Sequence, residues 1–111
     1  MLFWYDENGM VLPWAEGSLE EADVESWRQW INDHEMVAWT NVGKCVVATK
    51  FCGQNLPGGM FFTTVIDARW REMSRFQSLT YADAISTHVC AKQDLERAHR
   101  SSHGDYYPSN P

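Results

Sequence analysis

The middle of the chain reads Lys44-Cys45-Val46-Val47-Ala48-Thr49-Lys50-Phe51 and, after a short interval, Phe61-Phe62-Thr63-Thr64-Val65-Ile66. β-Branched and aromatic side chains dominate both runs, which is typical of buried strands. The interval between them contains Asn55-Leu56-Pro57-Gly58-Gly59, a sequence rich in turn-forming residues. The pattern therefore predicts two long strands that pair as an antiparallel hairpin at the centre of the fold.

Two further elements are expected on the N-terminal side of this hairpin. Asn8-Gly9 separates two apolar runs within residues 2–14, which predicts a short β-hairpin with a type I′ turn. The pattern Ser18-Leu-Glu-Glu21 is a capping box and predicts a helix from about Leu19 to His34. Apolar or aromatic residues recur along that helix at spacings of three and four, and they are Val24, Trp27, Trp30, Ile31 and His34.

The rest of the chain predicts one more strand and one more helix. Residues 37–43 read as a strand that turns at Asn41-Val-Gly43, whereas residues 69–78 are polar and give no assignment. Thr80, with Asp83 three residues later, predicts the start of a second helix that ends near His99. The inward face of that helix is expected to carry Tyr81, Ala84, Ile85, His88, Ala91 and Leu95.

Length and element order predict a single α+β domain. The chain has 111 residues and a mass of 12.8 kDa, which suffices for one modest core. We expect an antiparallel meander with an N-terminal hairpin and two helices packed on one face, over residues 1–100. Residues 101–111 are small, polar and proline-containing, and are expected to form a flexible tail.

Composition excludes several classes of protein. The formal net charge of −6 disfavours direct binding of nucleic acid by bulk electrostatics. No apolar run is long enough to cross a membrane, and no signal peptide is visible, so we expect a cytoplasmic protein. Three cysteines, Cys45, Cys52 and Cys90, form no metal-binding pair and are expected to be free thiols. No metal or other cofactor is predicted.

Several short motifs together resemble a family of small uncharacterised proteins from actinobacterial phages and prophages. They are Val47-Ala-Thr-Lys-Phe-Cys-Gly53, Phe62-Thr-Thr-Val65, Tyr81-Ala-Asp-Ala84 with His88, and the opening Trp4-Tyr-Asp-Glu-Asn-Gly9. The sequence departs from the family pattern at Thr63, which replaces a glutamate, at Cys52, which replaces a leucine, and at Asn55-Leu56, which replaces Asp-His. The resemblance implies a phage or mobile-element origin and an accessory role, and implies no particular activity.

One group of residues suggests a ligand site. Arg69, Trp70, Arg71 and Arg75 form the only basic cluster of the sequence, and guanidinium groups beside an aromatic ring can hold a phosphate and stack a base. A solvated strand end explains the same cluster. His88 is the second candidate, because a histidine in the middle of an inward helix face is either a site residue or a core residue bonded to a strand carbonyl or a threonine hydroxyl.

A second group suggests a surface for a partner protein. Residues 1–39 carry a net charge of −8, whereas residues 40–111 carry +2. Acidic residues at a helix start also complement the helix dipole, which is the structural explanation for them. The aromatic residues exceed what a small core holds, and exposed tryptophans are common in interfaces. The candidate surface residues are Glu20, Glu21, Asp23, Glu25, Trp14 and Trp39.

These observations support three hypotheses about function. The leading one is a phage-type accessory protein, expected to be a homodimer or small oligomer, that binds and blocks or sequesters a host or antiviral-defence component without catalysis. The alternative is a sponge-like binder of a small nucleotide or another anionic signal. A weaker alternative is a small hydrolase or transferase that uses His88 with a cysteine or Asp83. The sequence contains no recognisable catalytic motif.

Overall fold

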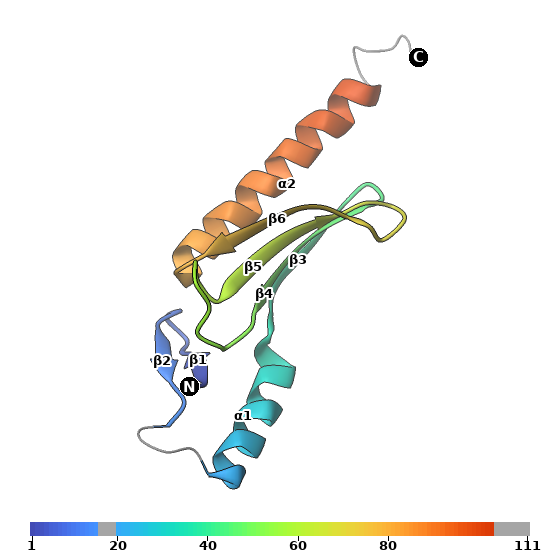
Figure 1. The fold of residues 1–111 in the computed structure, drawn as a ribbon. Coiled ribbons are helices and arrows are strands. Elements are labelled where there is room, and N and C mark those ends of the chain that lie inside the picture. The colour runs from blue at the N-terminus through green and yellow to red at the C-terminus, as the bar shows by residue number, and fades with distance from the viewer. Residues whose placement is uncertain (16–19, 104–111) are drawn as a thin grey trace.

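The computed structural model of the chain describes residues 1–15 and 20–103. It confirms the α+β class, with a two-stranded hairpin, a four-stranded antiparallel sheet and two helices (Figure 1). In chain order the elements are β1 (Phe3–Tyr5), β2 (Val11–Pro13), α1 (Glu21–His34), β3 (Met36–Val42), β4 (Cys45–Phe51), β5 (Phe61–Ile66), β6 (Glu72–Ser78) and α2 (Tyr81–His103).

The larger sheet is a meander in the order β3-β4-β5-β6. The predicted central hairpin is β4 and β5, in a register that places Thr49 opposite Thr63. The segment 69–78, which the sequence left unassigned, supplies β6 at one edge of the sheet. Its pattern is uninformative because nearly every residue of this edge strand is exposed, so no alternation of buried and exposed positions is imposed on it.

Helix α2 lies across one face of the sheet (Figure 1). Its predicted cap is confirmed, since the Asp83 amide donates to the Thr80 hydroxyl at 3.1 Å. The helix continues to His103, beyond the predicted end at His99, because residues 100–103 contain neither glycine nor proline. Residues 101–103 therefore belong to the helix and not to the predicted tail, and residues 104–111 lie outside the described part of the chain.

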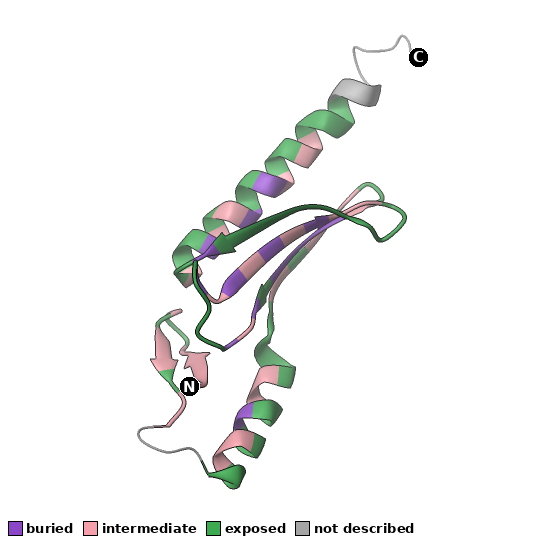
Figure 2. Ribbon diagram, in the orientation of Figure 1, coloured by how far each residue is buried: buried purple, intermediate pink, exposed green. Residues whose placement is uncertain are grey.

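The core lies between α2 and the sheet (Figure 2). Alternate strand positions face the helix, and small alanines on α2 allow the helix to approach the larger strand side chains. The buried apolar residues of this layer are Val47, Phe51, Phe61, Val65, Ala84 and Ala91.

The β1–β2 hairpin and α1 pack together at one end of the sheet (Figure 1). The Trp27 indole donates to the Phe3 carbonyl at 2.7 Å, and the Phe51 amide donates to the Glu35 carbonyl at 2.8 Å. Helix α1 buries Trp27 and packs the half-buried Trp30 and Ile31 against the edge of the core. Helix α2 thus covers the sheet, while α1 and the hairpin close its end.

The β1–β2 turn is not the predicted type I′. Of its residues only Gly9 has a positive φ, at 82°, whereas a type I′ turn requires two. The Asp6 carboxylate accepts the amides of Asn8 and Met10, each at 2.9 Å, and the Gly9 amide donates to the Asp6 carbonyl at 3.0 Å. These bonds favour a three-residue loop with one left-handed residue, which is the pattern of a type I turn followed by a bulge.

Helix α1 begins two residues later than expected. Its first residue is Glu21 and its N-cap is Glu20, whose amide donates to the Asp23 carboxylate at 3.2 Å. The predicted cap, Ser18, and the predicted first residue, Leu19, lie outside the described residues.

Candidate binding groove on the uncovered sheet face

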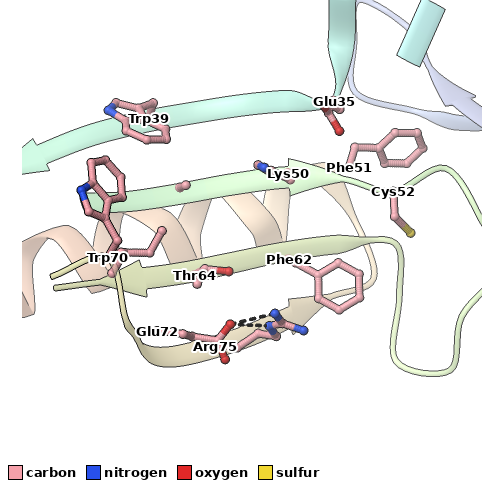
Figure 3. Close-up of a pocket in the computed structure, with 12 residues that line it drawn as sticks. Glu35, Trp39, Lys50, Phe51, Cys52, Phe62, Thr64, Trp70, Glu72 and Arg75 are labelled. Atoms are coloured by element: carbon pink, nitrogen blue, oxygen red, sulfur yellow. Dashed lines mark hydrogen bonds and ion pairs between the residues drawn. The ribbon is translucent and has the colours of Figure 1, made fainter. Parts of the chain in front are cut away.

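The face of the sheet opposite α2 carries a groove of about 540 Å³ (Figure 3). Antiparallel sheets usually present polar side chains on an uncovered face. Here apolar and aromatic side chains of three strands and of the β5–β6 loop point outward on the uncovered face. The residues that line the groove include Trp39, Lys50, Phe62, Ile66, Trp70 and Arg75.

Two tryptophans form one end of this groove (Figure 3). Trp39 comes from β3 and Trp70 from the β5–β6 loop, and 45% and 71% of their surfaces are exposed. The sequence assigned Trp70 to a ligand site and Trp39 to a partner surface, whereas the structure brings both to the same groove. The β3–β4 register, which pairs Trp39 with Ala48, is what directs Trp39 to this face.

The backbone of Trp70 is in the left-handed region, with φ at 63°. This conformation is unfavourable for a bulky side chain and common only for glycine. The loop is held in place by Asp67, whose Oδ1 accepts the amides of Arg69 and Arg71, each at 2.9 Å. The Trp70 amide also donates to the Asp67 carbonyl at 2.9 Å. Backbone strain at an exposed aromatic residue is more common at binding sites than elsewhere.

The carboxylate of Asp67 also neutralises Arg71. The Arg71 Nε donates to Asp67 Oδ2 at 3.1 Å. The backbone amide of Arg71 is the main cause that lowers the pKa of Asp67, with further contributions from the Arg69 amide and the Arg71 charge. Arg71 is therefore a loop-stabilising residue in this structure, and it does not line the groove.

Arg75 is likewise paired. Its Nε and Nη2 both contact Glu72 Oε1, at 3.1 and 2.7 Å, and its guanidinium lies 5.9 Å from the centre of the Phe62 ring. Within residues 1–15 and 20–103, no ion pair involves Lys50, whose side chain also lines the groove. With Glu35 and Glu72 opposite Lys50 and Arg75, the formal charges of the groove balance.

His88 lies on the other side of the sheet, between α2 and the strands, and is 5% exposed. Its Nε2 is 2.9 Å from the Thr40 hydroxyl and its Nδ1 is 2.8 Å from the Thr49 hydroxyl, which is in turn 2.7 Å from the Thr63 hydroxyl. Burial is the main cause that lowers the pKa of His88, and the charge of Lys92 adds to it. The structure thus separates His88 from the arginine cluster and gives it threonine partners in the core.

The other predicted surface residues do not lie together with the groove. Glu20, Glu21 and Glu25 are exposed near the start of α1, and Asp23 is half-buried there. Figure 1 shows this end of α1 pointing away from the four-stranded sheet. Trp14 packs instead beside Trp4 and Trp30. Sequence reasoning missed the groove residues Phe62 and Ile66, although their alternation with the buried positions of β5 was the available signal.

The described residues were also compared with the requirements of a metal site, a disulfide and a membrane-spanning helix. No group of three or more His, Cys, Asp or Glu side chains among them is arranged to hold a metal ion, and Cys45, Cys52 and Cys90 are free thiols. No helix in this part of the chain combines the length and the apolar character that membrane crossing requires. Comparison with known protein families, curated proteins and solved structures finds no match to this chain.

Proposed function

We propose that this protein acts by binding, without catalysis, and that it blocks or sequesters a partner protein through the groove on the uncovered sheet face. The observation that carries the proposal is the pair of exposed tryptophans at one end of the groove, Trp39 and Trp70. Tryptophan is the residue most enriched at the energetic centres of interfaces. The unfavourable backbone of Trp70 supports a selected role for that side chain.

The charges of the groove favour a protein over a small anion. Arg71 is paired with Asp67 and Arg75 with Glu72, so a carboxylate already offsets the charge of each guanidinium. An anion there meets a neighbouring carboxylate as well as a guanidinium, and among the described residues that line the groove Lys50 is the basic residue without an ion pair. A groove with balanced charges and an aromatic end is typical of the core and rim of a protein interface.

The resemblance to phage and prophage proteins supports a host or antiviral-defence component as the partner. A protein that acts in this way works stoichiometrically and shows no turnover. His88 gives little support to the weaker hydrolase or transferase hypothesis, because both of its ring nitrogens are engaged by threonine hydroxyls and it lines no part of the groove.

A comparative pull-down tests this proposal. Tagged wild type, Trp39→Ser, Trp70→Gly and the control Val89→Ser are exposed to a host lysate, since Val89 is an exposed apolar residue of α2 and is not part of the groove. We expect one protein to be retained by wild type and by the control and lost from both tryptophan variants, and the purified partner to bind with the same preference. Equal retention by all four proteins would contradict the proposal.

A small nucleotide-like ligand is the second candidate for the same groove. It is favoured by the two tryptophans, which offer faces for base stacking, and by the unpaired Lys50. Native mass spectrometry of the gently purified protein distinguishes the candidates, because a bound nucleotide adds a defined mass. The same spectrum shows whether the chain is a dimer. If it is, substitution of Trp39 tests whether a second copy of the chain occupies the groove.

If a nucleotide is bound, its contacts differ from those expected from the sequence alone. Trp70→Ala and Lys50→Ala are expected to reduce affinity at least tenfold, because they remove the stacking face and the unpaired cation. Arg71→Ala is expected to change the conformation of the β5–β6 loop but not the affinity for the nucleotide, since Arg71 is paired with Asp67. Equal loss of affinity in all three variants would show that Arg71 leaves Asp67 to contact the ligand.

A further inference from the structure

Three tryptophans line a separate hollow of about 320 Å³ between the β1–β2 hairpin and α1. They are Trp4 in β1, Trp14 just after β2, and Trp30 in α1, and each is half-buried. Among residues 1–15 and 20–103, no other residue lines this hollow. Its walls are thus almost entirely aromatic rings, contributed by three segments that are separated in the sequence.

The rings form a nearly equilateral arrangement. Their centroids are 6.3 Å apart for Trp4 and Trp14, 6.2 Å for Trp4 and Trp30, and 6.0 Å for Trp14 and Trp30. The interplanar angles are 90°, 86° and 44°, so the rings do not stack as a single block. A group seated about 3.5 Å above the plane of these centroids lies roughly 5 Å from all three, which is within the ~6 Å distance of a cation–π interaction for each ring whose face it meets.

The positions of the rings are fixed by neighbouring contacts. Trp30 stacks on His34, with ring centroids 4.5 Å apart and planes inclined by 5°. The Trp14 amide donates to the Leu2 carbonyl at 2.8 Å, and Trp4 is held in β1 by pairing with β2. The backbone of Trp4 and Trp14 and the ring of Trp30 are thus held before a ligand arrives, which reduces the ordering cost of binding.

The part of the chain that carries the three tryptophans is acidic. Residues 1–35, which include all three tryptophans, contain nine acidic residues and one basic residue, Arg28. Arg28 is itself paired with Glu25 at 3.5 Å. A strongly negative surface raises the local concentration of cations and repels anions. Aromatic walls in an acidic surface are the combination that recognises methylated ammonium groups.

We propose that Trp4, Trp14 and Trp30 form a cage for a methylated ammonium cation, the group shared by choline and trimethyl-lysine. This site is independent of the sheet-face groove, because neither set of lining residues contains a member of the other. The acidic end of the molecule, which the sequence suggested as a partner surface, would then recognise a cationic group and not simply a basic protein.

The direct test compares two probes of the same shape. Choline is titrated into the full chain in parallel with 3,3-dimethylbutan-1-ol, its neutral isostere, and the indole N–H signals of the six tryptophans are followed by NMR. We expect choline to shift the signals of Trp4, Trp14 and Trp30 and to bind at least tenfold more tightly than the isostere. Equal binding of both probes, or binding of neither, would overturn the proposal.

Two substitutions and two further probes refine this test. Trp14→Leu keeps an apolar side chain but removes a ring, and is expected to weaken choline binding at least tenfold, whereas Trp39→Leu leaves it unchanged. Because the probe comparison uses the wild-type chain, it remains decisive even where Trp14→Leu does not fold. Phosphocholine and a trimethyl-lysine peptide then distinguish a lipid headgroup from a modified protein as the source of the cation.

Discussion

Trp70 occupies in the β5–β6 loop the position that Gly9 occupies in the β1–β2 loop. In each loop an aspartate accepts two backbone amides at 2.9 Å, two and four residues later, and these aspartates are Asp6 and Asp67. In each loop the fourth residue has a positive φ, 82° at Gly9 and 63° at Trp70. The two loops thus share one conformation, in which the left-handed position is taken by the favourable Gly9 in the first loop and by the unfavourable Trp70 in the second.

Exchanging Trp70 for glycine tests whether this tryptophan is kept for binding. Because Gly adopts the left-handed region without a steric penalty, Trp70→Gly is expected to leave the free energy of unfolding unchanged or to raise it by up to about 1 kcal/mol. Trp39→Gly, in the regular strand β3, is expected to lower it by about 1 kcal/mol. Urea denaturation measures both values, and a strongly destabilised Trp70→Gly would show that the ring is needed for folding.

Removing the charge of Asp67 is expected to destabilise the β5–β6 loop in a pH-dependent way. The folded-state pKa of Asp67 is lowered, so its charged form contributes stability above its ordinary value of 3.8, and this contribution is lost as the pH falls through the folded pKa. Asp67→Asn should therefore be less stable than wild type at pH 7, with a difference that shrinks toward pH 3. Asp33→Asn, on the exposed side of α1, is the matched control.

Acidification is expected to destabilise the fold through His88 before the carboxylates titrate. Its folded-state pKa is lowered from 6.5, so the unfolded chain binds a proton more readily, and stability falls as the pH drops below 6.5 until the lower folded pKa is reached. His88→Gln should remove this part of the decrease between pH 7.5 and 5. An identical slope for wild type and His88→Gln, measured by urea denaturation at each pH, would rule out this contribution.

The threonine–histidine network is expected to stabilise the fold as one unit. His88→Leu leaves the hydroxyls of Thr40 and Thr49 without a ring nitrogen in a buried layer, which should cost about 1–3 kcal/mol. Combining it with Thr40→Val removes the hydroxyl that has lost its histidine partner, so the double variant should be less destabilised than the sum of the single variants. Strict additivity in thermal and urea denaturation would contradict a coupled network.

Local pattern was sufficient to predict most elements of this fold. The β-branched run of β4 and β5, and the spacing of Ala84, His88 and Ala91 along α2, follow from burial of one face and are visible without coordinates. Edge strand β6 was not predictable in this way, because an exposed strand has no buried face to impose a period. Likewise the type of the β1–β2 turn depended on the Asp6 carboxylate, which the Asn-Gly pair does not reveal.

The sequence by itself determined the class of fold, the inward face of α2 and the presence of surplus tryptophans, since each follows from neighbouring residues and composition. Only the tertiary structure decided how those tryptophans are grouped. Strand register joins Trp39 with Trp70, and the packing of α1 against the hairpin joins Trp30 with Trp4 and Trp14. The tertiary structure likewise decided which charges are paired. Asp67 and Glu72 form ion pairs with Arg71 and Arg75, and these pairs depend on side-chain geometry and not on composition.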